Sequence, residues 1–310
     1  MNKLSKRLLV HLKEVARDRD PYFASLGHFY VREYIRQELQ QWGEVEIDKF
    51  EVKGKIHQNL ILNLPPLKNE VKAENEQSFS FYSLVPQNIY NFSFFGSSNS
   101  ELAPVLISAH YDAVPGSPGA DDDGTGIAVL LEMAREFATE PLKYPVRLVA
   151  FDMEEMGLLG SENYAEKLHQ EQQELRLMLS LEMLGYCDKS PNSQTYPQGL
   201  QFFYPDRGDF IALMGNFSTL YDMISIGSSI RKKGTPCEWL PVQNRGLLIP
   251  DTRRSDHAPF WDRGYRAIMV TDTANMRNPN YHQKSDTIET LDLDFLTGVC
   301  QGLIAGLRSL

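Results

Sequence analysis

The sequence predicts an α/β protein with three layers: a mixed, mainly parallel central sheet with helices on both faces. From Pro104 onward, short apolar runs of strand length alternate with segments whose apolar residues recur at helical spacing. The chain has 310 residues, of which 42 % are hydrophobic, as is typical of a globular enzyme with a large core. Neither an internal repeat nor a clear linker divides it. We therefore expect one domain over residues 1–310.

The elements are expected in the following order. Two amphipathic helices come first, one over residues 4–15 and one over residues 31–42 that Gly43 closes. Asp123 is expected to cap a helix that runs to about Phe137, and the last eighteen residues form a C-terminal helix. The polar stretch 67–103 is expected to be a surface excursion with hairpins near 79–82 and 90–95. The expected strands are residues 45–52, 59–64, 105–109, 146–151, 177–181 and 267–271.

Charge, hydrophobic runs and cysteine content limit the partners and the location that we expect for the protein. The formal charge of −10 argues against nucleic acid or an anionic membrane as the main partner, because both attract basic surfaces. No stretch approaches the ~18 apolar residues that a membrane span requires. The three cysteines are far apart and form no CxxC pair, which favours free thiols in a reducing compartment. Residues 8–10 are too short an apolar run for a secretory signal, so we expect a cytoplasmic protein. Nothing indicates its oligomeric state.

Histidines and carboxylates follow several of the expected strands. In open α/β sheets, ligands bind outside the carboxyl ends of the strands, so these side chains are expected to meet at one place. Taken singly, each has a plainer interpretation as a solvated loop, a helix cap or a hydrogen-bonded core histidine. Together they place many carboxylates close to one another, which is costly unless cations compensate them. Two divalent metal ions would do so. The residues concerned are His110, Asp112, residues 121–123, Asp152, Glu154, Glu155, Glu182 and His282.

Four segments resemble the family-28 metallopeptidases, which are di-zinc aminopeptidase-like hydrolases in a superfamily that also includes the glutaminyl cyclases. The segments are Ile107–Asp112, Gly119–Gly126, Phe151–Gly157 and Tyr281–Thr287. They occur in the order of the family and at compatible spacings, and the likeness covers about residues 100–300. It implies the zinc-exopeptidase fold and the removal of N-terminal residues from peptides.

The resemblance also implies a role for each residue. His110 and Glu182 are expected to hold one metal, Glu155 and His282 the other, and Asp122 to bridge the two. Glu154 matches the general base, and Asp112 the acid that orients the His110 imidazole. Many relatives have Asp where this chain has Glu182, which alters the reach of that ligand. Imidazole and carboxylate donors with an open position suit two zinc ions, although manganese or cobalt could replace them.

The segment Ser255–Trp261 resembles the rim of the family's active site, and Arg254 directly precedes it. Asp256 and His257 are expected to support the ligands or the local structure, with His257 as the alternative to His282 as a metal ligand. Arg254 is expected either to contact the substrate or to lie in a solvated loop. The sequence has no HExxH, GxSxG or P-loop motif, which removes zincins, serine hydrolases and nucleotide hydrolases. Two alternatives stay open: a glutaminyl cyclase with a single zinc, and a binding module that has lost catalysis. Metal analysis discriminates all three.

Overall fold

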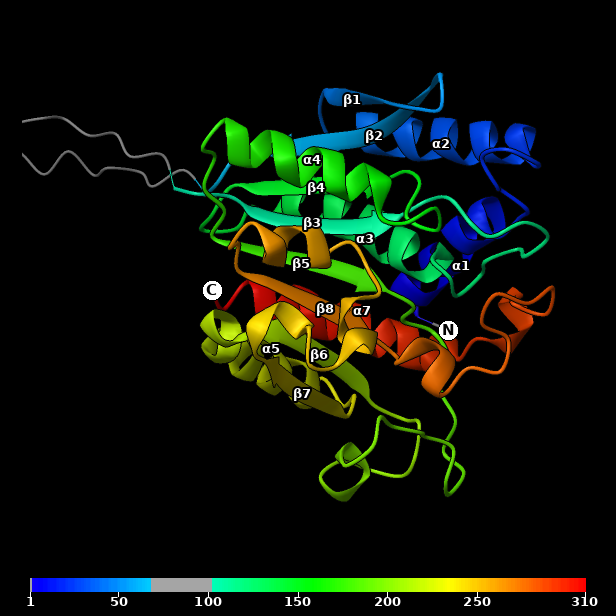
Figure 1. Ribbon diagram of the computed structural model, residues 1–310, viewed down its shortest axis with the longest axis vertical. Helices are drawn as coiled ribbons and strands as arrows, with labels where there is room; N and C mark the ends of the chain where they lie inside the picture. Colours follow the sequence, from blue (N-terminus) through cyan, green and yellow to red (C-terminus); the bar gives the residue numbers. More distant parts are fainter. Residues whose placement is uncertain (1, 68–101) are drawn as a thin grey trace, which may run out of the picture.

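The computed structural model describes residues 2–67 and 102–310. Within these residues, eight strands form one sheet in the order β1-β2-β4-β3-β5-β8-β6-β7 (Figure 1). The strands are β1 (Val45–Val52), β2 (Lys55–Leu64), β3 (Val105–His110), β4 (Val146–Phe151), β5 (Leu177–Glu182), β6 (Ile211–Asn216), β7 (Cys237–Val242) and β8 (Ala267–Thr271).

The sheet is mixed and mainly parallel, as predicted. The pairs β3–β4, β3–β5, β5–β8 and β6–β7 are parallel. The pairs β1–β2, β2–β4 and β6–β8 are antiparallel. The parallel strands β3, β5 and β8 lie in the middle of the sheet and are buried along their whole length, because helices and loops cover both of their faces.

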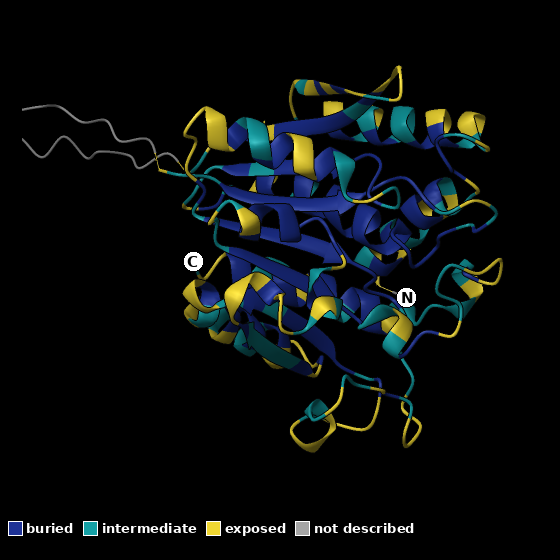
Figure 2. Ribbon diagram, viewed as in Figure 1, coloured by how far each residue is buried: buried dark blue, intermediate teal, exposed yellow. Residues whose placement is uncertain are grey.

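Helices cover both faces and complete the three predicted layers, with the sheet as the buried middle layer (Figure 2). One face packs against α1 (Lys3–Val15), α2 (Ser25–Gln40), α3 (Gly124–Thr139), α5 (Leu220–Lys232) and α7 (Leu293–Leu307). The other packs against α4 (Leu159–Gln170) and the short α6 (Ala258–Asp262). Short 3-10 helices lie in the loops at Leu200–Phe202, Phe217–Thr219, Asn244–Gly246, Pro250–Arg253, Ala274–Met276 and Ile288–Thr290.

Most of the predicted elements are confirmed, and three of the strands have both of their predicted ends. Asp123 caps α3 by accepting a hydrogen bond from the Gly126 amide. Strand β2 begins four residues earlier than expected, because it pairs with β1 as far as Val52 and Lys55 across a tight turn. The prediction for Gly43 is wrong: α2 ends at Gln40, and Gly43 instead lies where a side chain would press on Leu62.

Strands β6 and β7 and helices α4 and α5 were not predicted from the sequence. The run of β6 ends in Gly215 and Asn216, and β7 contains Pro241, so both resemble loops. Strand β7 tolerates a proline because it is an edge strand. The two hairpins, and all of the predicted 67–103 excursion except residues 67, 102 and 103, lie outside the described part of the chain. No helix within the described ranges is long and apolar enough to cross a bilayer.

Candidate metal centre

The predicted ligands lie together at the carboxyl ends of the central strands. His110 is the last residue of β3, and Glu182 is the last residue of β5. Glu155 follows β4, Asp122 lies just before α3, and His282 lies in the loop between β8 and α7 (Figure 1). The strands β3, β4, β5 and β8 are parallel to one another. Their carboxyl ends therefore lie together along the same end of the strands, where ligands bind in such sheets.

Asp122 lies between the two histidines. Its Oδ1 is 3.2 Å from His110 Nε2, and its Oδ2 is 3.2 Å from His282 Nε2. Glu182 Oε2 is 3.8 Å from His110 Nε2, whereas Glu155 Oε2 is 3.1 Å from His282 Nε2. The structure thus brings all five predicted ligands together as two sets that share Asp122.

Several ligand atoms are buried without a hydrogen-bond partner among the described residues. They are His110 Nε2, Asp122 Oδ2, Glu155 Oε1, Glu182 Oε2 and His282 Nε2. An unpaired buried polar atom is costly, and so many of them facing one another indicate a site built for a ligand that satisfies them. Imidazole nitrogen and carboxylate oxygen are donors that zinc accepts, so these residues fit the predicted metal.

The electrostatics of the cluster favour added positive charge. Burial raises the pKa of Glu154 and Glu182 well above the usual range, since their charged forms lose water and repel neighbouring carboxylates. Burial opposes charge on His282 as well, but Asp122 and Glu155 outweigh it and raise its pKa to about 9. Without a metal, bound protons reduce the negative charge of this cluster. A metal cation would neutralise the carboxylates in place of these protons.

Asp112 connects the first ligand to the loop that carries the next ones. Its Oδ1 lies 3.4 Å from His110 Nδ1, the ring nitrogen that faces away from the ligand cluster. The same carboxylate accepts hydrogen bonds from the backbone amides of Glu154 and Glu155, at 3.0 and 3.1 Å. It therefore orients the His110 ring and holds the β4 loop beside it.

A family model for peptidase family M28 matches residues 95–305 of this chain. The chain belongs to peptidase family M28. The Escherichia coli protein YfbL is 35 % identical over 211 residues, which cover 64 % of this chain and 65 % of that one. The Bacillus subtilis aminopeptidase YwaD is 44 % identical over 196 residues, or 62 % of this chain and 38 % of that one. The chain spans less than two thirds of the length of these curated relatives.

Solved structures show the same fold at low sequence identity. The LapA aminopeptidase of Legionella pneumophila superposes with a TM-score of 0.67 at 15 % identity, over 98 % of this chain and 70 % of that one. The glutaminyl cyclase of Porphyromonas gingivalis gives 0.63 at 16 % identity, over 99 % and 96 %. These likenesses confirm the α/β fold that the M28 resemblance implied.

Two further aspartates of the 121–123 run hold the M28 site in shape. Asp123 accepts hydrogen bonds from the amides of His110 and Met183, and so joins the ends of β3 and β5. Asp121 accepts from the amide of Gly185 and the side chain of Asn278. Only Asp122 faces both histidines, so the three consecutive acids divide into one ligand candidate and two that fix the backbone around it.

Asp286 and the left-handed residues of the site were not singled out from the sequence. Asp286 accepts hydrogen bonds from the backbone amides of Asp121 and Asp122, and it lies within the Tyr281–Thr287 segment that carries the resemblance. Three non-glycine residues at the site have left-handed backbone: Met153 (φ 62°), Met183 (φ 52°) and His282 (φ 60°). Such strain is typical of functional sites that the surrounding fold holds in place.

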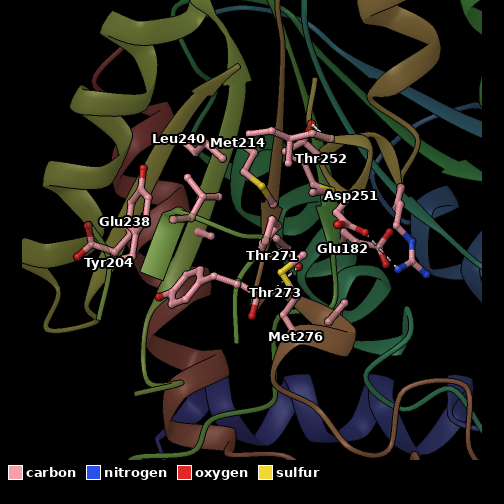
Figure 3. Close-up of a pocket in the computed structure, with 18 of the residues that line it drawn as sticks. Glu182, Tyr204, Met214, Glu238, Leu240, Asp251, Thr252, Thr271, Thr273 and Met276 are labelled. Atoms are coloured by element: carbon pink, nitrogen blue, oxygen red, sulfur yellow. Dashed lines mark hydrogen bonds and ion pairs between the residues drawn. The ribbon is translucent and has the colours of Figure 1, made fainter. Parts of the chain in front are cut away.

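The rim residues differ in their relation to the ligands. Asp256 is buried, and burial raises its pKa to about 7. His257 points away from the cluster: its Nε2 contacts the Thr252 carbonyl at 2.7 Å, and its ring packs edge-on against Trp261. Arg254 donates hydrogen bonds to Asn275 and to the hydroxyl of Tyr281, whose ring stacks on His282. It also lines a pocket that opens beside Glu182 (Figure 3).

Proposed function

We propose that the protein is a di-zinc aminopeptidase that removes the first residue from peptides. The observation that carries this proposal is the position of Asp122, which presents one carboxylate oxygen to each of two histidine–carboxylate sets. A carboxylate so placed would be a ligand of both metals and would hold them at one site, where they would supply Lewis acidity to a water molecule. Membership of family M28 supports zinc, and the number of ions is part of the proposal.

Each residue then has a defined task. In such a site zinc supplies Lewis acidity, which polarises a carbonyl group and lowers the pKa of water toward ~7. Glu154 has a buried carboxylate at the same cluster, with Oε2 3.9 Å from His110 Nε2. Its raised pKa suits a group that accepts a proton from water and later donates it to the leaving amine. Asp112 holds Glu154 and His110 in position relative to each other, because it accepts a hydrogen bond from the Glu154 backbone amide and contacts the His110 ring.

A panel of aminoacyl amides and dipeptides, run with and without a chelator, tests the proposal. We expect hydrolysis from the N-terminus, loss of activity on chelation and its return with zinc. Elemental analysis of the purified protein is expected to give about two zinc equivalents per chain, one for each histidine–carboxylate set. A chain that binds zinc but hydrolyses no amide would contradict the proposal.

A glutaminyl cyclase is the alternative outcome of the same experiment. The structural likeness to such an enzyme shows a shared fold only, at 16 % identity. One tightly bound zinc, together with cyclisation of peptides that begin with glutamine, would establish this activity. A protein that binds neither zinc nor substrate would be the binding module instead.

The expected location and partners depend on further experiments. A peptide is the proposed substrate, since the chain belongs to a family of peptidases. The three cysteines form no disulfide with one another in the described residues, which supports a reducing compartment. The cytoplasmic location stays a prediction, and fractionation of the native host tests it.

A further inference from the structure

An elongated pocket begins at the candidate metal centre and runs across the sheet to its edge. Its floor is the face of β5, β8, β6 and β7 that points away from α5. Figure 3 shows Glu182 and Glu238 at its opposite ends, with Met214, Thr271 and Thr273 between them. We name this feature the edge pocket and define it by Glu182, Thr271, Ala212 and Glu238 along its floor.

The strand register explains its shape. Glu182 pairs with Thr271, Thr271 with Ala212, and Ala212 with Glu238, so the four residues form one row across four strands. Side chains directly opposite one another in a sheet point to the same face. Because Thr271 and Ala212 are small, the row leaves a trough between its two carboxylates.

The walls of the edge pocket are mainly apolar and aromatic. Helices α4 and α6 cover this face of the sheet farther along, but over β6 and β7 loops replace them. The side chains that line the trough are Tyr196, Tyr204, Phe210, Met214, Leu240 and Met269. Arg254 and Asp251 lie at its rim, where they form an ion pair of 3.9 Å with each other.

Glu238 supplies the charge at the outer end. Its side chain is half-buried, and it forms neither an ion pair nor a side-chain hydrogen bond with any residue in 2–67 or 102–310. Glu182 at the other end belongs to the candidate metal centre. The edge pocket therefore has one carboxylate that the metal site accounts for and one that is open to a ligand.

We propose that the edge pocket binds the side chain of the substrate's first residue, and that it selects a long side chain with an apolar stem and a cationic end, as in arginine or lysine. This inference rests on the proposed aminopeptidase function and specifies its substrate class. The apolar walls contact the stem, and Glu238 pairs with the guanidinium or ammonium group. A neutral side chain of the same length would remove water from the Glu238 carboxylate without supplying the opposite charge that compensates for this loss.

The dimensions agree with such a side chain. Three strand spacings of about 4.8 Å separate the backbones of Glu182 and Glu238 by roughly 14 Å. A substrate whose first carbonyl lies at the metal centre begins near Glu182, and an extended arginine side chain reaches about 7 Å from its Cα. A glutamate side chain of about 5 Å that leans over the small Ala212, together with a nitrogen–oxygen contact of about 2.8 Å, closes the remaining roughly 7 Å. Leucine is too short to reach it.

Matched pairs of aminoacyl amides isolate the charge from the length. Arginine amide is compared with citrulline amide, and lysine amide with norleucine amide. We expect kcat/KM to be about five- to twentyfold higher for the cationic member of each pair, as suits a half-exposed charge pair. This preference should shrink as the salt concentration rises, because salt screens a partly exposed pair.

Two substitutions assign the preference to the edge pocket. Glu238→Gln should remove it by slowing the arginine and lysine substrates while leaving citrulline and norleucine amides nearly unchanged. Glu51→Gln, on an exposed position of β1 at the opposite edge of the sheet, is the matched control and should change neither. Ala212→Leu fills the floor and should slow every long substrate relative to alanine amide.

A binding measurement separates this inference from the proposed function. Calorimetry with zinc-loaded protein is used to compare the affinities of free arginine and citrulline. If arginine binds more tightly and Glu238→Gln abolishes the difference, the edge pocket is supported even where no amide is hydrolysed. Equal binding and equal turnover of the matched pairs, unchanged in Glu238→Gln, would overturn it whether or not the chain is a peptidase.

Discussion

Arg19 donates a hydrogen bond of 3.1 Å to the backbone carbonyl of Asp122, the residue that lies between the two site histidines. Arg19 is fully buried between α1 and α2, outside the residues that the family model matches. Its guanidinium also binds the carbonyls of Tyr111, Pro118 and Gly119 at 2.6–2.9 Å. The N-terminal segment therefore fixes the loop that carries Asp112 and Asp122.

Replacement of Arg19 should weaken both the fold and the metal site. Arg19→Met leaves several buried carbonyls without a donor and removes a positive charge near the acidic cluster. We expect a loss of about 2–4 kcal/mol in the free energy of unfolding and roughly tenfold weaker zinc binding. Urea unfolding and competition with a chromogenic chelator measure the two effects. Arg17→Met, at a nearby half-buried position, is the control. If folded Arg19→Met bound zinc with wild-type affinity, Arg19 would contribute to folding and not to the metal site.

Gly119 is required where the Arg19 guanidinium meets the same loop. It has a φ of +58°, and an added Cβ would clash with the backbone carbonyl of Asp122 and lie 2.8 and 2.9 Å from the two terminal nitrogens of Arg19. Gly54 also has a positive φ of +79° but faces open space, so Gly54→Ala measures backbone strain alone. We expect about 1 kcal/mol for Gly54→Ala and at least 2 kcal/mol more for Gly119→Ala, by urea unfolding. Equal losses would contradict the close contact.

The central strands could be predicted because both of their faces are buried. Strand β8 begins with four consecutive apolar residues, and β4 is apolar except at Arg147, so the sequence delimits both strands at both ends. Strand β7 is only partly buried at its four middle positions, contains a proline and lies at the edge of the sheet, so its sequence carries no such signal. The pocket residues that β7 contributes depend on its neighbouring strand and on the register between the two. Both follow from the strand pairing and not from the β7 sequence.

The site could be predicted in outline because polar residues at the ends of buried strands have few structural reasons to be there. His110, Glu155 and Glu182 are of this kind. The choice of Asp122 from three consecutive aspartates came from the family resemblance, and the structure shows Asp122 facing both histidines. Arg19 had no sequence signal, because its hydrogen bonds go to backbone carbonyls, which every residue has.

Removal of the Glu154 carboxylate should abolish turnover without emptying the site. The five proposed ligands are intact in Glu154→Ala, so metal content should stay near two equivalents. Loss of a general base costs about 10²–10⁴-fold in kcat, which steady-state kinetics on an aminoacyl amide would measure. Glu162→Ala, an exposed acid on α4, is the control. Full activity in Glu154→Ala would exclude the general-base role.

Chelation should destabilise the protein more at pH 8 than at pH 6. Without a cation, Glu154 and Glu182 retain pKa values raised by burial, so folding favours their protonated forms and stability falls as pH rises. His282, with a pKa of about 9, acts in the same direction, because the folded state holds its proton more tightly than the unfolded state. Thermal unfolding with and without chelator at both pH values measures the effect. A larger loss at pH 6 would contradict this account of the charges.

Glu132 of α3 should give the opposite pH dependence. Although burial opposes its charge, hydrogen bonds from His11 and Arg7 lower the pKa of Glu132 to about 2. Arg7 Nε lies 2.9 Å from both carboxylate oxygens, which ties α1 to α3. A lowered pKa means that the folded state favours the carboxylate, so this stabilisation is complete above the unfolded pKa near 4.5. It is lost as pH falls toward 2.

Glu132→Gln should therefore destabilise the protein by on the order of 2 kcal/mol at pH 7 and by progressively less from pH 5 to pH 3, because protonation of wild-type Glu132 removes its advantage; the two chains become alike only as pH falls toward 2. Urea unfolding at four pH values measures the difference between them. Glu33→Gln on α2 is the control and should show a small, flat difference, because this partly exposed acid forms ion pairs with Arg32 and Arg36 of its own helix. A penalty for Glu132→Gln that stays constant down to pH 3 would mean that shape, and not charge, joins α1 to α3.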